Sequence, residues 1–224
     1  FNQIINNLAK THYRWNQNED VMVRMPTGAG TGAGPFHSQS NEAWFTKTPG
    51  LKIAYPAFPD DAKGLLIQSF EDPNPVLFFE HKKLYRSLKG NVPEGFYTTP
   101  FGKARTVKEG NDVTIITYGL GVHIALEFAE KNPEISLEIV DLRTLIPLDT
   151  ETIYKSVKKC NKVIILHEDT LTCGFGAELS ALISEHCFED LDAPILRVAS
   201  MDTPIPFNKK LEDQFMPNEE LAEA

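Results

Sequence analysis

Residues 113–142, VTIITYGLGVHIALEFAEKNPEISLEIVDL, show the clearest alternation of predicted strand and helix in the sequence. The pattern predicts an apolar strand over Val113–Tyr118 and another over Leu137–Leu142, with a helix over Gly121–Lys131 between them. Apolar strands without alternation are buried on both faces, and a helix that joins two of them is typical of a parallel sheet with right-handed crossovers. The stretch therefore predicts an α/β fold.

The same alternation continues towards the C-terminus and is looser towards the N-terminus. Downstream, it predicts the helix Thr150–Cys160, the strand Lys162–His167, the helix Gly174–Cys187 and the strand Ile195–Ala199. Upstream, it predicts the helix Phe1–His12, the strand Val21–Met25, a short helix over Asn41–Phe45 with Ser40 as N-cap, the strand Leu51–Tyr55, the helix Asp61–Phe70 capped by Asp60, and the strand Val76–Glu80. The downstream block is a doubly wound domain, and the upstream block is half of one.

A segment rich in glycine and proline separates the two blocks, which is typical of a linker. We therefore expect a first domain over residues 1–86, a linker over 87–104 and a second domain over 105–224. The first domain starts at Phe1, without Met and in the middle of an uncapped helix. This start predicts that the chain is a fragment.

The composition excludes several classes of protein. Of the 224 residues, 42% are hydrophobic and 24% are charged, which is typical of globular domains and unlike disordered or collagen-like chains. The formal net charge of −9 repels phosphate backbones, so general nucleic-acid binding is not expected. No apolar run reaches the roughly 20 residues that cross a bilayer. Three cysteines without a CxxC spacing predict a reducing compartment and no disulfide framework.

Two glycine-containing turns are candidates for cofactor binding. The loop at residues 28–34, GAGTGAG, could cradle a phosphate, but it lacks the Lys-Ser/Thr ending of a Walker loop. A loop that lets the backbone approach a ligand or a neighbouring chain is therefore favoured. Gly119 and Gly121, with Asp141 about 20 residues later, match part of a dinucleotide fingerprint. Ile124 stands where the third small residue belongs, so a structural role for the turn is favoured over NAD binding.

His37 is the candidate for acid–base chemistry. It follows the glycine-rich loop and precedes the predicted N-cap, which places it at a loop tip near the positive end of a helix. An imidazole exchanges protons near neutral pH and suits this chemistry. A histidine with a purely structural role is the alternative.

Other polar groups lie at the ends of predicted elements. His167, Glu168 and Asp169 end a buried strand at its carboxyl edge, where α/β sheets bind ligands, and packing at an interface is an equal alternative. The acidic pair Asp60 and Asp61 begins a predicted helix. We expect this pair to form a cap and a solvated helix end.

The motifs of this chain resemble, in order, those of the beta subunits of thiamine-dependent 2-oxoacid dehydrogenases. They are RMPTG at 24–28, FHSQSNEAWF at 36–45, PGLKI at 49–53, DAKGLL at 61–66, EDPNP at 71–75, LYR at 84–86, DLRTLIP at 141–147 and TCGFGAE at 172–178. The resemblance covers nearly the whole chain. Residues 40–43 and 79–86 look most like the branched-chain (2-oxoisovalerate) enzymes.

The resemblance implies a transketolase-like architecture and a role in an oxidoreductase. Residues 1–86 would be the C-terminal part of the pyrimidine-binding domain, and 105–224 the transketolase C-terminal domain. The full assembly, a 3-methyl-2-oxobutanoate dehydrogenase of branched-chain amino acid catabolism, would decarboxylate a 2-oxoacid and pass the acyl group to lipoamide. His37 would be catalytic, because opening of the dithiolane ring requires protonation of a departing sulfur.

The resemblance also implies cofactors. Thiamine diphosphate and Mg²⁺ would be held mostly by an alpha subunit or the alpha part of a fused chain. No cofactor-binding residue is expected in this chain, because the glutamate that activates the cofactor lies upstream of it. The fragment alone is therefore expected to be inactive. A structural potassium ion is implied near the EDPNP turn, with the ligands Asp72 and Asn74 and carbonyls near Ser69, Glu19, Val21 and Met22.

The implied partners are an alpha subunit or alpha part, a second beta subunit, a lipoyl acyltransferase core and the 2-oxoacid substrate. The bacterial cytoplasm is favoured over the mitochondrial matrix as the location. Three alternatives stay open: a module that only docks subunits, a pyruvate dehydrogenase beta subunit, and an NAD-binding oxidoreductase domain.

Overall fold

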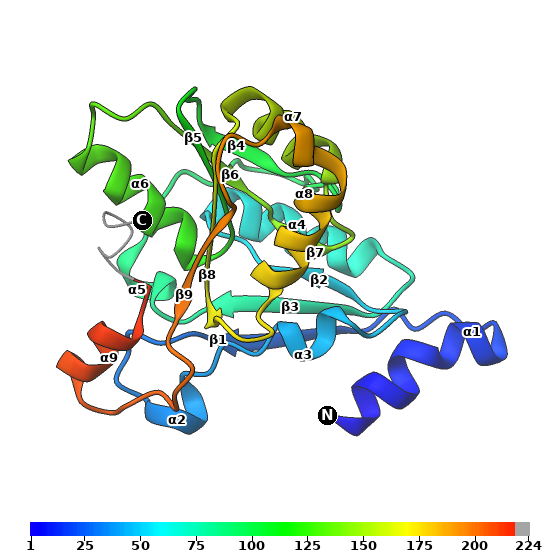
Figure 1. Ribbon diagram of the computed structural model, residues 1–224. Helices are drawn as coiled ribbons and strands as arrows, with labels where there is room; N and C mark the ends of the chain where they lie inside the picture. The colour runs from blue at the N-terminus through cyan, green and yellow to red at the C-terminus, as the bar shows by residue number, and fades with distance from the viewer. Residues whose placement is uncertain (218–224) are drawn as a thin grey trace.

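Two sheets organise the chain, and helices cover them (Figure 1). The computed structural model describes residues 1–217, so residues 218–224 of the expected second domain lie outside the described residues. The strands are β1 Met22–Thr27, β2 Lys52–Ala54, β3 Val76–His81, β4 Arg105–Lys108, β5 Val113–Thr117, β6 Leu137–Asp141, β7 Thr144–Ile146, β8 Val163–Thr170 and β9 Leu196–Ser200. The first sheet has the order β1-β3-β2-β7 and the second the order β4-β6-β5-β8-β9.

The helices confirm most of the sequence pattern. They are α1 Thr11–Trp15, α2 Gly34–His37, α3 Ala43–Thr46, α4 Pro59–Glu71, α5 Leu84–Ser87, α6 Leu120–Lys131, α7 Thr150–Cys160, α8 Phe175–Cys187 and α9 Lys209–Phe215. Short helical turns precede α1 over Gln3–Asn7 and Leu8–Lys10, and another, over Phe188–Asp190, follows α8. The sequence pattern misses β4, β7, α2, α5 and α9, because these elements are short and carry little periodicity.

The second sheet has the predicted doubly wound form. Strands β5, β6, β8 and β9 pair in parallel, whereas β4 runs antiparallel to β6. Helix α6 lies on one face of this sheet, and α7 and α8 lie on the other (Figure 1). Covering both faces explains why these strands are continuous apolar runs.

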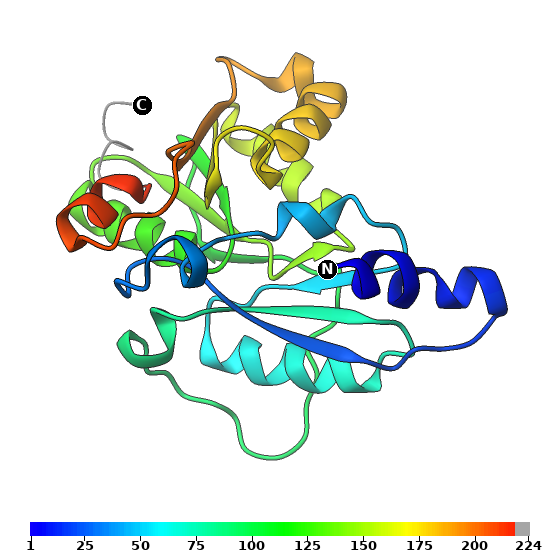
Figure 2. The same cartoon turned by 90° about the horizontal axis from the view of Figure 1, so that it is seen from below.

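The first sheet is covered by α4 on one face and by the second domain on the other (Figure 2). Phe78 of β3 packs with Leu65 of α4, whereas Leu77 and Phe79 point into a core that also contains Tyr118 and Phe175. Strand β7, from the expected second domain, pairs antiparallel with β2 and completes the first sheet. One face of the expected half domain is thus covered by the other half of the chain.

The predicted N-cap of the helix after the glycine-rich loop is wrong. Helix α3 begins at Ala43, and Glu42 is the cap residue without a side-chain capping bond. The Ser40 hydroxyl instead donates to Glu168 Oε1 at 3.0 Å. The hydroxyl that was expected to cap a helix therefore donates its hydrogen bond to a buried carboxylate.

The predicted cap of α4 is also wrong. Phe58 is the cap residue, and the helix begins at Pro59. Proline is favoured in the first turn of a helix because it has no N–H group, and an N–H group there would lack a partner within the helix. Asp61 is not solvated but 3% exposed. It forms ion pairs with Arg143 (2.8 Å) and Arg105 (3.1 Å).

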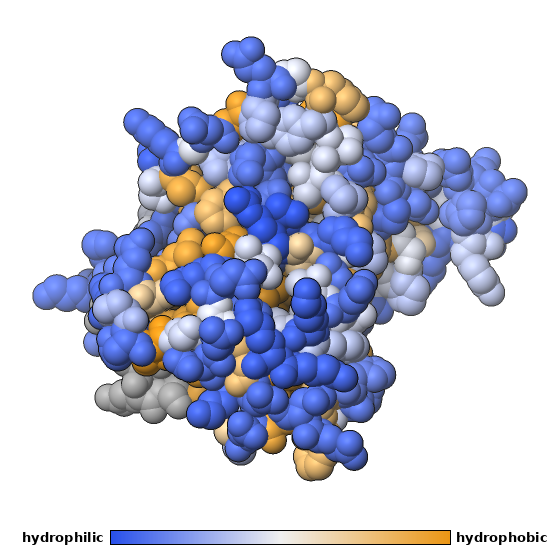
Figure 3. All heavy atoms as spheres, turned by 90° about the horizontal axis from the view of Figure 1, so that it is seen from above, coloured by the Kyte–Doolittle hydropathy of each residue, from blue (hydrophilic) through white to orange (hydrophobic). Residues whose placement is uncertain are grey.

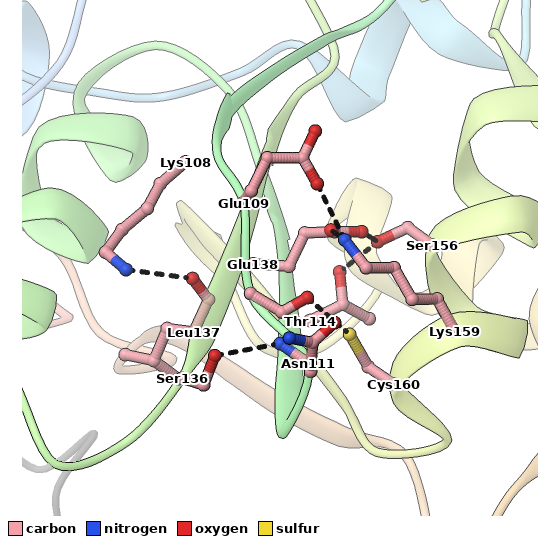
Figure 4. Close-up of polar contacts among 11 residues, drawn as sticks. Lys108, Glu109, Asn111, Thr114, Ser136, Leu137, Glu138, Ser156, Lys159 and Cys160 are labelled. Carbon is pink, nitrogen blue, oxygen red and sulfur yellow. Dashed lines mark hydrogen bonds and ion pairs between the residues drawn. The ribbon is translucent and has the colours of Figure 1, made fainter.

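A polar cluster fixes α7 on the second sheet (Figure 4). Glu138 of β6 is buried, accepts a hydrogen bond from the Ser156 hydroxyl (2.5 Å) and forms an ion pair with Lys159. The Thr114 and Ser156 hydroxyl oxygens are 2.6 Å apart. A carboxylate buried between a sheet and a helix needs such partners to offset its desolvation.

The surface seen from above is mostly hydrophilic, with hydrophobic side chains in small groups (Figure 3). Within residues 1–217, no helix combines the length and the apolar character that a membrane span requires.

Candidate active site

The glycine-rich loop is held by two carboxylates of the second domain. The Ala29 N–H donates to Glu168 Oε1 at 2.6 Å. The N–H groups of Gly30 and Gly32 donate to Glu212 Oε1 at 2.9 and 3.1 Å. Successive amides that converge on an acceptor form an anion nest. Because side chains of this chain fill the nest, the loop approaches another segment of the protein and does not hold a phosphate here.

Gly28 allows the loop to lie against the first sheet. Its φ is +94°, a conformation that other residues adopt only at a cost. A Cβ atom at this position would lie 2.1 Å from His81 Nε2. The glycine therefore allows both the turn and the approach of the His81 ring.

Glu168 is the centre of the polar contacts. It is 7% exposed, and besides Ala29 and Ser40 it contacts His81 Nε2 through Oε2 at 2.5 Å. Burial alone would raise the pKa of the Glu168 carboxyl, but His81 and the other donors lower that pKa below its usual value. Glu168 is therefore an ionised carboxylate inside the protein.

Glu42 lies close to Glu168 and has the opposite protonation behaviour. Its side chain is fully buried, and Oε1 accepts a hydrogen bond from the Tyr118 hydroxyl at 2.8 Å. Burial, together with the nearby charge of Asp169, raises the pKa of Glu42 to about 8. Burial also raises the pKa of Asp169 to about 6. The site thus holds a protonated carboxyl near an ionised one at neutral pH, a separation that acid–base sites use.

His37 is the last residue of α2 and is exposed. It therefore lies at the C-terminal end of a short helix and not near a positive helix end as expected, because Gly34 and Pro35 start the helix earlier. Pro35 and Gln39, on either side of His37, line a pocket of about 180 Å³ together with Ser40, Glu168 and Asp169. The segment that carries the imidazole thus borders a pocket lined by both polar and apolar side chains.

His167 is separate from these contacts, although its neighbours Glu168 and Asp169 belong to them. It is fully buried, and burial lowers its pKa to about 4. A Cβ atom at Gly174 or Gly176 would come within 2.5 Å of its ring. His167 therefore serves the packing of α8 on β8, which is the structural alternative for this residue.

The turn at Gly119 and Gly121 is packed against side chains. A Cβ atom at Gly119 would lie 2.6 Å from the Tyr55 ring, and one at Gly121 would lie 2.2 Å from Thr117 Oγ1. Asp141 is fully buried, its pKa is raised to about 7 by burial, and Oδ1 accepts a bond from the Arg143 N–H (3.0 Å). The two glycines thus allow the turn to pack closely against Tyr55 and Thr117.

The six residues expected near a potassium ion lie in the segments that lead into β1 and β3 of the first sheet. Met22 is in register with Val76, just after the turn that contains Asp72 and Asn74. Asp72 Oδ1 accepts bonds from the N–H and the Nδ2 of Asn74, both at 2.9 Å, and Oδ2 pairs with Lys52 Nζ at 2.5 Å. Lys52 therefore already neutralises the only carboxylate of the expected set that is buried.

The other expected potassium ligands form hydrogen bonds within the protein or line a neighbouring pocket. The Ser69 hydroxyl donates to the Leu65 carbonyl (2.7 Å), and the Val21 carbonyl accepts from the Val76 N–H (3.0 Å). Glu19 lines a pocket of about 470 Å³ that Asn74 also borders. In the part of the chain that the structure describes, no three His, Cys, Asp or Glu side chains are grouped so as to hold a metal ion.

Three residues of the site were missed by the sequence reasoning: Glu42, His81 and Glu212. Glu42 lies inside the FHSQSNEAWF motif, which was a usable signal. Gly30 and Glu212 are 182 positions apart in the sequence, so no local pattern connects them.

Fold and sequence together define the class. The chain matches the models of the transketolase pyrimidine-binding domain over residues 1–87 and of the transketolase C-terminal domain over residues 102–221. It belongs to the transketolase family. A solved structure described as a split gene transketolase, an inactive beta4 tetramer, matches with a TM-score of 0.73 and 23% identity over 96% of this chain and 66% of that one. At this identity the match shows the fold.

Within that family, the chain is similar in sequence to beta subunits of 2-oxoisovalerate dehydrogenases and of acetoin oxidoreductases. It is 49% identical over its whole length to the 2-oxoisovalerate dehydrogenase subunit beta of Bacillus subtilis (strain 168), of which it covers 70%. It is 48% identical to the mitochondrial 2-oxoisovalerate dehydrogenase subunit beta of Dictyostelium discoideum, over 92% of this chain and 57% of that one. It is 44% identical to the acetoin:2,6-dichlorophenolindophenol oxidoreductase subunit beta of B. subtilis, over 97% of this chain and 64% of that one. The resemblance to 2-oxoacid dehydrogenase beta subunits and the transketolase-like fold are confirmed, and the chain spans between 57% and 70% of these relatives.

Proposed function

We propose that the protein containing this chain is the decarboxylating component of a branched-chain 2-oxoacid dehydrogenase complex. It would convert a branched-chain 2-oxoacid, such as 3-methyl-2-oxobutanoate, to CO₂ and an acyl group that passes to lipoamide. The observation that carries this proposal is the 49% identity, over the whole chain, to a 2-oxoisovalerate dehydrogenase beta subunit. The exposed His37 supports it, because Pro35 and Gln39 on either side of it line a pocket together with Glu168 and Asp169.

Thiamine diphosphate, when bound, supplies the electron sink that decarboxylation requires. The amides of the glycine-rich loop already bind Glu168 and Glu212, so this loop does not fit a diphosphate. We therefore assign the diphosphate and its Mg²⁺ to an alpha subunit or alpha part. This chain contributes His37, whose imidazolium gives a proton to the sulfur that departs when the dithiolane ring of lipoamide opens.

The assembly would also contain a second beta subunit and a lipoyl acyltransferase core, and the proposed location is the bacterial cytoplasm. Free cysteines at 160, 173 and 187 are compatible with a reducing compartment. Affinity capture of the chain from its native lysate tests these partners. Recovery of a thiamine-site alpha polypeptide and a lipoyl acyltransferase is the expected result, and recovery of neither by a folded bait would contradict it.

A structural potassium ion stays part of the proposal, held mainly by backbone carbonyls because Lys52 pairs with Asp72. It is tested by thermal unfolding in KCl and in NaCl at equal ionic strength. A higher melting temperature in KCl supports the ion, and identical temperatures would remove it from the proposal.

The role of His37 is tested in the enzyme assembled with its alpha partner. In the His37→Ala variant we expect acylation of a lipoyl domain to fall by about 10²-fold or more, because general acid catalysis contributes on this scale. Decarboxylation measured with a reducible dye should be retained, because it needs no lipoamide. Unchanged acyl transfer would contradict the assignment.

A second candidate is acetoin cleavage, which is favoured by the 44% identity to an acetoin oxidoreductase beta subunit. Dye reduction by the assembled enzyme separates the two candidates. A higher kcat/KM for 3-methyl-2-oxobutanoate supports the first candidate, and a higher kcat/KM for acetoin supports the second.

A further inference from the structure

The segment that carries His37 is a closed loop. The Thr27 hydroxyl donates to the Gln39 carbonyl at 2.6 Å, and the Gly28 N–H donates to the same carbonyl at 3.3 Å. The two ends of residues 27–40 are therefore held side by side. Between them lie the glycine-rich loop and the short helix α2, which ends at His37.

One carboxylate oxygen joins both sides of this loop. Glu168 Oε1 accepts from the Ala29 N–H on one side (2.6 Å) and from the Ser40 hydroxyl on the other (3.0 Å). Ala29 is fully buried and Glu168 is 7% exposed, so water competes little for these bonds. Hydrogen bonds to a buried charged acceptor are stronger than those between neutral groups.

Glu168 is itself held in one orientation. His81 Nε2 contacts Oε2 at 2.5 Å, and the His81 ring lies against Gly28 at the first turn of the loop. His81 is 2% exposed and ends β3, a central strand of the first sheet. The loop that carries His37 is thus fixed through Glu168 to both sheets.

We propose that Glu168 is a positioning residue for the reaction: it fixes the loop of residues 27–40 so that His37 meets the sulfur of lipoamide. This inference rests on the proposed function, in which His37 is the acid. His37 is exposed at the end of a helix of four residues, so its placement depends on how the loop is fixed. The role proposed for Glu168 is exerted through the loop, by its bonds to Ala29 and Ser40.

The test uses the enzyme assembled with its alpha partner and compares Glu168→Gln with Glu178→Gln, an exposed residue of α8. Misplacement of a reacting group by about 1 Å can cost roughly 10²-fold in rate. In Glu168→Gln we expect lipoyl-domain acylation to fall by about 10- to 100-fold, with a much smaller effect on dye-linked decarboxylation. Hydrogen exchange of the amides in residues 28–40 should accelerate. Glu178→Gln should behave as the wild type.

The double variant His37→Ala/Glu168→Gln separates positioning from a general structural role. If Glu168 acts through His37, the double variant acylates the lipoyl domain no more slowly than His37→Ala alone. Additive losses, or equal losses of decarboxylation and acyl transfer in Glu168→Gln, would overturn the proposal.

The controls also distinguish this proposal from the proposed function. Normal acyl transfer in His37→Ala would overturn the role of His37 and the positioning role with it. Slow transfer in His37→Ala with normal transfer in Glu168→Gln would overturn the positioning role alone. If Glu168→Gln does not fold, Ser40→Ala removes one of the two loop contacts and should give a smaller loss confined to acyl transfer. No loss in Ser40→Ala would then overturn the proposal.

Discussion

Single residues decide the conformation of the loop at the site. Gly28 and Gly32 both have positive φ, at +94° and +69°, but their surroundings differ. At Gly28 a Cβ atom would overlap the His81 ring, whereas at Gly32 nothing lies within 4 Å. The two positions therefore separate backbone strain from steric overlap.

We predict that Gly28→Ala destabilises the protein by about 3 kcal/mol, the sum of left-handed strain and overpacking. Gly32→Ala should cost about 1 kcal/mol, because only the strain applies. Urea unfolding of the two variants measures the difference. Equal costs would show that His81 moves away without penalty.

The buried carboxyl of Glu42 makes stability depend on pH. Its pKa is raised to about 8 in the folded state, so the folded protein keeps a proton that the unfolded chain releases at lower pH. This stabilisation is fully present below the unfolded pKa and is lost as pH rises towards 8. The raised pKa of Asp169, at about 6, acts in the same direction.

We predict that Glu42→Gln reduces the loss of stability between pH 5 and 8. The Glu42 contribution changes by at most about 1.4 kcal/mol per pH unit. The free energy of unfolding at several pH values, for the variant and the wild type, measures the change. Identical pH slopes would show that Glu42 is ionised in the folded protein.

At the scale of elements, side chains that face an inner layer fix the helices on the sheets. The hydroxyl of Ser156 on α7 is buried and bonded to Glu138 and Thr114 on two different strands (Figure 4). Its removal leaves these groups short of a partner, which costs about 1–3 kcal/mol.

We therefore predict that Ser156→Ala lowers the free energy of unfolding by about 2 kcal/mol. Ser180→Ala, on the half-buried side of α8, should change it by less than about 0.5 kcal/mol. Chemical denaturation of both variants measures this. Equal effects would mean that the polar cluster contributes no specific stability.

Long and regular elements could be predicted from the sequence, whereas several short elements could not. Helix α7 and strands β5 and β6 followed from their apolar spacing, because these elements are long and regular. Strand β7 has only three residues and pairs with β2 in the sheet of the other domain, so no local sequence pattern predicts it. Ser40 has the chemistry of a cap, but the tertiary contact with Glu168 decides its partner.

At the scale of the whole molecule, the two domains share one core. Tyr55 and Phe79 of the first domain pack with Tyr118 and Phe175 of the second. Strand β7 and the carboxylates of Glu168 and Glu212 add polar contacts across the same boundary. The sequence motif was enough to propose His37 as a site residue, whereas the residues that hold its loop come from distant parts of the sequence.

Because of this shared core, we predict that the chain unfolds in a single thermal transition. Scanning calorimetry tests this prediction, with equal calorimetric and van't Hoff enthalpies as the expected result. Two resolved transitions would show that the domains are stable independently.

The proposed acyl transfer can be measured as the mass of a lipoyl domain after incubation with the assembled enzyme and 3-methyl-2-oxobutanoate. We expect an added isobutyryl group on the lipoyl domain, together with release of CO₂. An unmodified lipoyl domain, with acetylation instead when pyruvate or acetoin is supplied, would contradict it.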